Sequence, residues 1–410
     1  MNDVRVPSFS PDDASLKADP YIAFARLRED DPIHRSELGY WVVSRHEDVR
    51  AVLMNRDDFG QGDFVENIRL FYGPDFDVMG QRGYKWLSEV FLMQDPPHHT
   101  RVRGLVTGAL TARRVRAMEP RILEITDRLI DDFAGDRRGD LIARLAYELP
   151  VRVMCDMLGI DPEDHRLPAV IDAIAQSFIV FEARALTEAE LATANTQIGV
   201  LQSFFESLFE DRKALPQDDL ATALVHAGGA EDALSHDELV TVAIGLFGAG
   251  FETTAHMIGN GLLSFSRFPD QWQRLVADPM ALAAGAVDEV LRYESSLIAT
   301  YRTALRATQV RGQAIAKGEK ILTLIGAGNR DPRVFDNPAS FDIGRDNAAK
   351  HLSFGGGIHF CVGAELARLE GRIAFERLAT RLPRLTVDTD APAWREGFLF
   401  RGMSTLAARW

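Results

Sequence analysis

The sequence predicts a mainly α-helical fold with a small β region, and three observations support this. Apolar and charged residues alternate at three- and four-residue spacing through most of the chain, which is typical of amphipathic helices. Segments rich in β-branched and aromatic residues are few and short. The 410 residues contain no linker and no internal repeat, so we expect one domain over 1–410. Its β-rich parts are expected at roughly 30–60, 295–325 and 385–410, with helices elsewhere.

Helices are predicted where the three- and four-residue pattern is strongest. They are expected at 23–27, 46–54, 100–117, 120–133, 141–158, 168–181, 188–212, 237–268, 269–276, 281–293 and 362–382. The segment 60–95 is rich in Phe, Tyr, Met and Gly, and we expect a long irregular connection there. Connections of that length in compact proteins are often functional.

Strands are predicted in three places. Segments 33–35 and 40–44 flank a short Glu-Leu-Gly turn and predict a hairpin. The segment 320–325 and the tail near 398–400 and 404–407 are expected to add small sheets.

Composition excludes several classes of protein. A formal charge of −14 disfavours nucleic acid as a partner. The run 239–266 is long enough to span a bilayer, but Glu252 near its centre would cost roughly 2–3 kcal/mol in lipid, so we expect a buried helix and no membrane contact. Only two cysteines are present, Cys155 and Cys361, far apart in the chain. They argue against a disulfide framework and favour the reducing cytoplasm.

The motif FGGGIHFCVG at 354–363 places Cys361 just before a predicted helix. A buried thiolate needs amide donors or positive charge, and the N-terminus of a helix supplies both. The glycines allow a turn without side chains against a flat surface. A lone cysteine in this position suits an axial ligand of haem iron, whereas zinc would need three more ligands. The alternative is an apolar cysteine that is simply buried.

A second motif, AGFETT at 249–254, lies inside the predicted buried helix. We expect Thr253 to donate a hydrogen bond to the carbonyl of Ala249 and open a local groove. Such a groove would bind dioxygen and a water molecule, with Glu252 as the proton source. Taken alone, the motif favours the alternative that Thr253 packs between helices and Glu252 joins a buried salt bridge.

Two further groups gain meaning only from the fold. Glu289 and Arg292 share a helix face, and Arg345 would close a buried acid–Arg–Arg network if it came near. Four cationic side chains are scattered over 260 residues, which matters only if an anionic ligand such as two haem propionates must be paired. These four are His99, Arg103, Arg302 and His359.

Taken together, these motifs closely resemble a bacterial cytochrome P450, a soluble haem-thiolate monooxygenase. The resemblance is carried by FGGGIHFCVG, AGFETT, EVLR, NRDPRVFDNPASFDIGR and DPPHHTRVR, which cover the chain in family order. It implies a triangular prism of about a dozen helices that encloses haem b, iron protoporphyrin IX. By this resemblance Glu252 and Thr253 are catalytic and relay protons, and Cys361 is the metal ligand. The residues expected to contact the cofactor are His99, Arg103, Ala249, Arg302, Phe354, His359, Cys361 and Gly363. Glu289, Arg292 and Arg345 would form a structural network behind it.

The resemblance also implies a reaction and its partners. One oxygen atom from O2 would enter a C–H bond, or an O- or N-dealkylation site, of a small hydrophobic or aromatic molecule. Two electrons would come from a [2Fe-2S] or similar ferredoxin with an NAD(P)H-dependent reductase. The protein is expected to be a monomer. Three alternatives remain open: a peroxide-driven peroxygenase, a haem-binding sensor without turnover, and a helical protein without haem.

Two sets of residues follow from the same resemblance. The substrate pocket is expected to include Phe71, Trp86, Leu87, Phe247, Ile298, Thr300 and Leu399. A basic docking patch for the ferredoxin is expected from Arg101, Arg113, Arg114, Arg116, Lys350 and Arg368.

Overall fold

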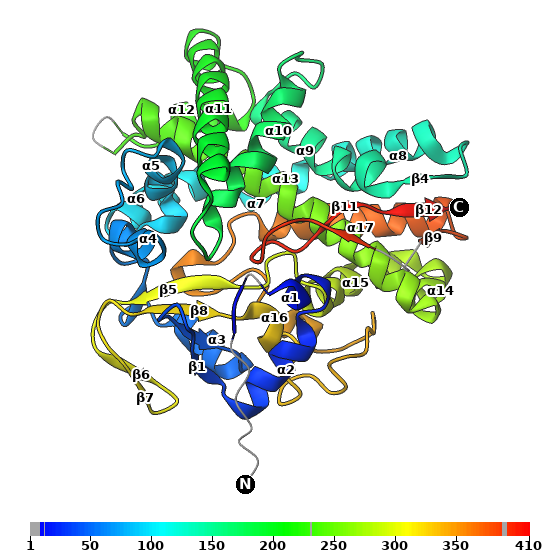
Figure 1. The fold of residues 1–410 in the computed structure, drawn as a ribbon. Coiled ribbons are helices and arrows are strands. Elements are labelled where there is room, and N and C mark those ends of the chain that lie inside the picture. Colours follow the sequence, from blue (N-terminus) through cyan, green and yellow to red (C-terminus); the bar gives the residue numbers. More distant parts are fainter. Residues whose placement is uncertain (1–8, 12, 230–231, 388–391) are drawn as a thin grey trace.

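The structure is a computed structural model that describes residues 9–11, 13–229, 232–387 and 392–410. The predicted fold class is confirmed, because helices dominate and the sheets are small. Figure 1 shows the long helices α10 and α11 in the upper part of the molecule and the strands β5 and β8 in the lower part. The expected β-rich tail at 385–410 includes residues 388–391, which lie outside the described part.

The helices alternate with short turns along the chain. In order they are α1 (Ala14–Ala18), α2 (Tyr21–Asp30), α3 (His46–Met54), α4 (Phe64–Tyr72), α5 (Arg82–Glu89), α6 (His98–Ala109), α7 (Ala112–Ala117), α8 (Glu119–Ala134), α9 (Glu148–Leu158), α10 (Leu167–Ser177), α11 (Glu188–Ala214), α12 (Leu220–Val225), α13 (His236–Arg267), α14 (Pro269–Ala277), α15 (Pro279–Tyr293), α16 (Ile325–Gly328) and α17 (Ala364–Arg381). Short 3₁₀ segments occur at η1 (Phe91–Met93), η3 (Phe178–Phe181), η4 (Ala348–Lys350) and η5 (Gly357–His359), and a π-helical turn at η2 (Ile142–Ala146).

The largest sheet has five strands in the order β1-β2-β8-β5-β3. Its strands are β1 (Ile33–Arg35), β2 (Trp41–Val43), β3 (Phe59–Gly60), β5 (Thr300–Ala304) and β8 (Lys320–Thr323). The predicted hairpin is present, with Ile33 opposite Val43, and β8 runs parallel to β2 and antiparallel to β5. The smaller sheets join β4 (Arg138–Asp140), β12 (Ala407–Arg409) and β9 (Thr386–Val387), then β6 (Thr308–Val310) with β7 (Gln313–Ile315), and β10 (Ala393–Trp394) with β11 (Met403–Thr405).

The prediction of an irregular segment at 60–95 is wrong, because it contains α4, α5 and η1. Helix α4 begins where the Asp63 carboxylate accepts a hydrogen bond from the backbone N–H of Glu66. This is an N-cap signal that favours a helix even over nine residues. The Phe, Tyr, Met and Gly content of the segment favoured a loop, yet both helices are amphipathic and bury one face, with Ile68 on α4 and Trp86 and Leu87 on α5.

Three other predicted elements differ from the structure. The helix expected over 100–117 is two helices, because the Thr111 side chain caps α7 and interrupts the ladder. The strand expected near 398–400 is only an isolated bridge between Leu297 and Phe400. The strand expected over 404–407 is split at Leu406 between β11 and β12.

Helix α13 is the central helix of the fold. A capping box fixes its start, in which Ser235 and Glu238 bond each other's backbone N–H. From there the helix packs against α9, α11, α15 and α17. None of the helices in the described ranges is long and apolar enough to cross a membrane.

Candidate functional site

One face of the buried helix α13 is accessible at its centre. Gly245 and Thr253 are half-buried and Ala249 is exposed, whereas nearly all their neighbours on the helix are buried. Four-residue spacing places these three on one face. The Thr253 hydroxyl donates to the carbonyl of Ala249 at 2.8 Å, the hydrogen bond predicted from the sequence. An accessible stripe in the middle of a buried helix borders open space inside the protein.

The thiol of Cys361 also faces open space inside the protein. Its side chain is accessible, yet the surrounding protein is dense enough that burial raises the pKa of the thiol. The backbone of Gly363 and the guanidinium groups of Arg103 and Arg368 act in the opposite direction and favour the thiolate. The backbone N–H of Cys361 donates to the carbonyl of Phe354 at 2.9 Å, which closes the loop.

The glycines before Cys361 have defined backbone roles. Gly355 and Gly357 have φ of 70° and 62°, in the left-handed region that favours glycine. A Cβ on Gly357 would lie 2.6 Å from the backbone oxygen of Leu53, so α3 lies directly against this turn. Phe354 packs beside the loop, 4.6 Å from the Arg368 guanidinium. Helix α17 begins at Ala364, two residues later than predicted, and Gly363 is the residue that precedes it.

The four scattered cationic side chains converge. The rings of His99 and His359 lie 4.5 Å apart, and Arg302 and Arg103 both act electrostatically on each ring. Burial, followed by the charges of Arg302, His99 and Arg103, lowers the pKa of His359 to about 2. Burial lowers the pKa of Arg302 to about 10, although Asp95 acts the other way.

No carboxylate of the described residues forms a salt bridge with these four side chains. Neither ring nitrogen of His359 has a hydrogen-bond partner among the described residues. The polar group that faces the ring of His99 is the backbone of Ile358. The Asp95 carboxylate is engaged by the backbone N–H groups of Gln61 and Gly62. Buried polar groups are nearly always paired, so two arginines beside two imidazole rings with unused nitrogens fit an anionic ligand.

Glu252 is buried next to Thr253, and only one of its two carboxylate oxygens has a partner among the described residues. One of its oxygens lies 3.4 Å from a guanidinium nitrogen of Arg395, and the other has no partner among the described residues. Burial raises the pKa of Glu252 to about 7, and Arg395 opposes the increase. A carboxyl group with a pKa near neutrality can both bind and release protons at physiological pH.

Glu289, Arg292 and Arg345 form a buried network that is fully bonded. Arg292 donates to both carboxylate oxygens of Glu289 at 2.7 Å, and both side chains are completely buried. Arg345 lies 3.2 Å from the same carboxylate. The remaining donors of Arg292 reach the carbonyls of Asn329, Pro338 and Ser340, which ties α15 to the segment after α16.

The residues expected in the substrate pocket fall into separate environments. Trp86 stacks on Phe178, and the rings of Phe178 and Phe181 reach Phe400 of the C-terminal segment. Phe247 is fully buried against Phe205 of α11, away from the accessible face of α13.

The other five expected pocket residues have different surroundings. Leu87 and Ile298 are buried, and the N–H of Leu399 donates to the Glu182 carboxylate at 3.3 Å. Thr300 is half-buried in β5, and Phe71 lies 4.8 Å from the ammonium group of Lys320.

Sequence reasoning missed several residues at this site. Arg395 and Tyr147 reach Glu252 from 143 and 105 positions away, and no local pattern marks either. Phe178 and Phe181 were assigned to a regular helix, and the 3₁₀ turn η3 directs them toward Phe400. The apolar run FIVF at the end of α10 was the available signal.

The site fits one kind of prosthetic group. No cluster of three metal-binding side chains occurs in the described ranges, which leaves Cys361 as a lone accessible thiol. A single thiolate, an apolar interior and a cation cluster without its own acids match haem with two propionates. The fold and site therefore define a haem protein with one thiolate ligand.

The chain belongs to the cytochrome P450 family, whose model matches residues 40–390. It is 37% identical to cytochrome P450 107B1 of Saccharopolyspora erythraea, covering 100% of this chain and 99% of that protein. It is 36% identical to the cytochrome P450 monooxygenase PikC of Streptomyces venezuelae, with 96% and 91% covered. The solved structure of P450BioI in complex with hexadec-9Z-enoic acid ligated acyl carrier protein matches with a TM-score of 0.88, at 30% identity over 97% of this chain and 100% of that one.

Membership settles the class of reaction and the cofactor. The protein is an oxygen-incorporating oxidoreductase whose cofactor is haem b, held by a cysteine thiolate. The expectation of a bacterial haem-thiolate monooxygenase is confirmed at this level.

Proposed function

We propose that the chain acts as one catalytic domain that inserts an oxygen atom from O2 into a C–H bond of a small hydrophobic or aromatic molecule. The observation that carries the proposal is the pair of accessible groups in a buried interior, the Cys361 thiol and the Ala249–Thr253 face of α13. An enclosed apolar site of this kind suits an apolar ligand.

Cys361 is the proposed ligand of the haem iron. His99, Arg103, Arg302 and His359 are proposed to pair the propionates, because they form the cationic cluster without a bound acid. Phe354 and Gly363 flank the sulfur, and Ala249 borders the face of the cofactor. When bound, the haem supplies the binding and activation of dioxygen, which a thiolate ligand promotes.

Glu252 and Thr253 are proposed to deliver protons during oxygen activation. The Thr253 hydroxyl borders the open space and is oriented by its bond to Ala249. Glu252 is the adjacent acid, with one free oxygen and a pKa of about 7. This pair favours O2-dependent turnover over a peroxide-driven reaction or a sensor, because neither of those needs an internal proton source.

Electrons are proposed to come from a [2Fe-2S] or similar ferredoxin and its reductase. Within the expected docking patch, Arg101 is already paired with Glu238 and Arg368 with Asp288. The members that support docking best are Arg113 and Arg116 of α7, which have no acid partner in the described part, with Arg114 beside them at 3.9 Å from Asp218. Exposed cations of this kind favour an acidic partner.

The network of Glu289, Arg292 and Arg345 is proposed to be structural. It joins α15 to the segment that precedes the Cys361 loop, and its central pair, Glu289 and Arg292, is completely buried. Its role would be to hold that segment in place.

Two measurements test the proposal. The absorption spectrum of the reduced, CO-treated protein should show the red-shifted Soret band of a thiolate-ligated haem, and Cys361→His should lose it. With a ferredoxin system and a substrate found by spin-state shift, Thr253→Ala should divert electrons to hydrogen peroxide. Thr254→Ala is the matched control, because Thr254 makes the same kind of bond, to Gly250, on a buried face. Full coupling in Thr253→Ala would remove its role in proton delivery.

A further inference from the structure

Helix α13 carries a polar stripe that begins at Glu252. We define the stripe as Glu252, His256, Asn260 and Ser264, which recur every four residues and so share one face. All four are at most 4% exposed, on a helix whose other buried positions are mainly apolar. Burying four polar side chains in a row is costly unless they are bonded, so the stripe calls for an explanation.

The stripe lies against the C-terminal segment of the chain. Arg395 approaches Glu252 at 3.4 Å, and Asn260 donates to the carbonyl of Arg401 at 2.9 Å. Between them, Gly402 is so close to His256 that a Cβ on it would lie 2.1 Å from the imidazole ring. Three successive members of the stripe therefore contact the C-terminal segment 395–402, Glu252 through the Arg395 side chain and the other two through backbone.

The members nearest Glu252 have unused hydrogen-bonding capacity. One oxygen of Glu252 and both nitrogens of His256 have no partner in the described part of the chain. Burial, with a smaller contribution from Arg395, lowers the pKa of His256 to about 3, so the ring is neutral and carries one donor and one acceptor. A carboxyl group and a neutral imidazole with free donors and acceptors are the side chains that take part in proton transfer, directly or through one water.

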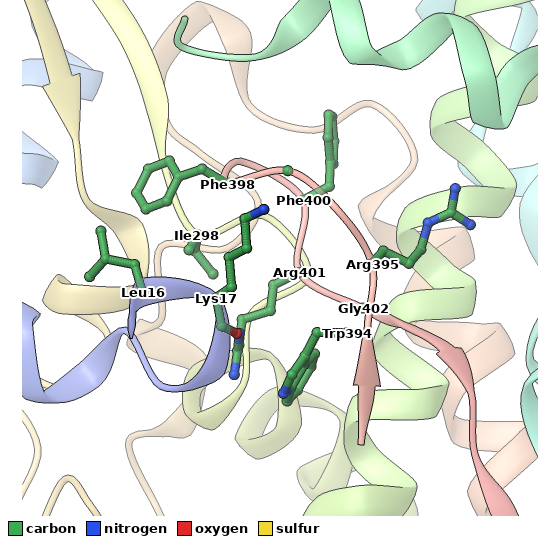
Figure 2. Close-up of a pocket in the computed structure, with 10 residues that line it drawn as sticks. Leu16, Lys17, Ile298, Trp394, Arg395, Phe398, Phe400, Arg401 and Gly402 are labelled. Atoms are coloured by element: carbon green, nitrogen blue, oxygen red, sulfur yellow. The ribbon is translucent and has the colours of Figure 1, made fainter. Parts of the chain in front are cut away.

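A small pocket lies on the C-terminal segment, and two of its lining residues, Arg395 and Gly402, also contact the stripe. Figure 2 shows it between the N-terminal helix α1 and the C-terminal segment, with Lys17, Trp394, Arg395, Arg401 and Gly402 among its lining residues. In that view the Arg395 side chain extends away from Lys17 and Phe398. Lys17 pairs with Glu396, whose side chain is 84% exposed, and this pair marks the outer end.

We propose that this pocket is the proton entrance of the enzyme, and that Arg395 and His256 connect it to Glu252. The inference rests on the proposed role of Glu252 in proton delivery. Arg395 is a positioning residue, since it lines the pocket and holds one oxygen of Glu252, while the Tyr147 hydroxyl accepts a hydrogen bond from it. His256 lies one turn beyond Glu252 and against Gly402, so it offers the second connection.

The charges around Glu252 predict different effects for the removal of Arg395 and of His256. The charged and titratable groups that face Glu252 from neighbouring elements are Arg395 and Tyr147. Arg395 favours the carboxylate, so its removal raises the pKa of Glu252 further. His256 is neutral and leaves that equilibrium unchanged, so its removal slows proton supply alone.

The test uses the haem-containing enzyme and two independent readouts. The first is an infrared titration of the Glu252 carboxyl band without turnover. The band is assigned with Glu252→Gln. Arg395→Met should move the midpoint upward, Arg395→Lys should restore it in part, and His256→Leu should leave it unchanged.

The second readout is the share of electrons released as hydrogen peroxide, together with the solvent isotope effect on turnover. Arg395→Met and His256→Leu should each lower coupled turnover roughly tenfold or more and change the isotope effect. His256→Gln keeps a donor and an acceptor and should recover most of the coupling. Ser264→Ala, at the far end of the stripe and outside the pocket, is the matched control and should behave as wild type.

The outcomes separate the two proposals. Impaired coupling in Glu252→Gln with normal coupling and normal titration in both Arg395→Met and His256→Leu would overturn the proton entrance alone. Normal coupling in Glu252→Gln would overturn the proton role of Glu252 and this inference with it.

Discussion

Two buried acid–arginine systems in this molecule have opposite character. Glu289 receives both N–H groups of Arg292 at 2.7 Å, a third contact from Arg345, and the backbone N–H of Asp342. Glu252 has a single guanidinium at 3.4 Å and one oxygen without a partner in the described part of the chain. Both carboxyl groups are almost completely removed from solvent.

The number of hydrogen bonds to each carboxylate determines what each system is able to do. A buried charge whose bonds are complete is fixed, because any change leaves a partner uncompensated. A buried carboxyl group with a weak partner has a raised pKa, so its charged and neutral forms have similar free energies near neutral pH. The first arrangement holds helix α15 against the segment that leads to Cys361, and the second suits a group that exchanges protons.

The largest effect is expected from breaking the complete network. Arg292→Met should lower the free energy of unfolding by about 3–5 kcal/mol, because Glu289 is left buried with too few donors. Urea unfolding and haem content measure this. Arg274→Met is the control, since Arg274 pairs with Asp342 at 2.7 Å but both side chains are nearly half exposed. A pair of that kind contributes at most about 1 kcal/mol. Equal losses in the two variants would contradict the assigned difference.

A second prediction compares the two acids under the same substitution. Glu289→Gln should destabilise the protein, whereas Glu252→Gln should stabilise it at pH 8. The pKa of Glu252 rises from 4.5 to about 7 on folding, so the unfolded chain loses this proton first. The stability that the protonated Glu252 carboxyl contributes is therefore fully present below pH 4.5. It is lost as the pH rises through about 7, by up to about 3 kcal/mol.

Unfolding free energies between pH 5 and pH 8 check this second prediction. The wild type should lose more stability over that range than Glu252→Gln, which has no group to ionise there. Parallel pH curves for the two proteins would contradict a raised pKa at Glu252.

A third prediction follows for turnover. If Glu252 donates protons, coupled product formation should decrease as pH rises through about 7, because the protonated form is depleted. The ratio of product to consumed NAD(P)H, measured from pH 6 to pH 9, shows this decrease. Glu252→Gln should be slower at low pH, by roughly 100-fold, and should lack the decrease. A wild-type profile that stays flat across this range would argue against Glu252 as the donor.

The smallest effect is expected at the docking patch, which is separate from both buried acid–arginine systems. Charge reversal in Arg113→Glu with Arg114→Glu should raise the apparent KM for the ferredoxin severalfold at low salt, with little change in kcat, because exposed charges mainly affect encounter. Arg128→Glu is the control, since Arg128 is an exposed arginine on α8, outside the patch, that pairs with Glu124. Equal KM values for the two proteins would remove α7 from the docking surface.

The helical class, the family and the local motifs could all be predicted from the amino-acid sequence. The hydrogen bond of Thr253 to Ala249 and the placement of Cys361 between a glycine turn and a helix depend on residues within one turn of each other. Contacts of that kind follow from spacing alone, since helix geometry fixes which residues share a face. The short helices α4 and α5 were not predicted, although both are amphipathic, because the glycines and aromatic residues of 60–95 are also typical of a long connection.

The way in which distant residues combine became visible in the folded chain alone. The convergence of His99 with His359, the contact of Arg345 with Glu289 and the approach of Arg395 to Glu252 each join segments from 56 to 260 positions apart. The sequence named the acids, but it gave no sign that one would be fully bonded and the other left with a free oxygen. That difference sets their pKa behaviour, because burial and the number of donors are properties of packing.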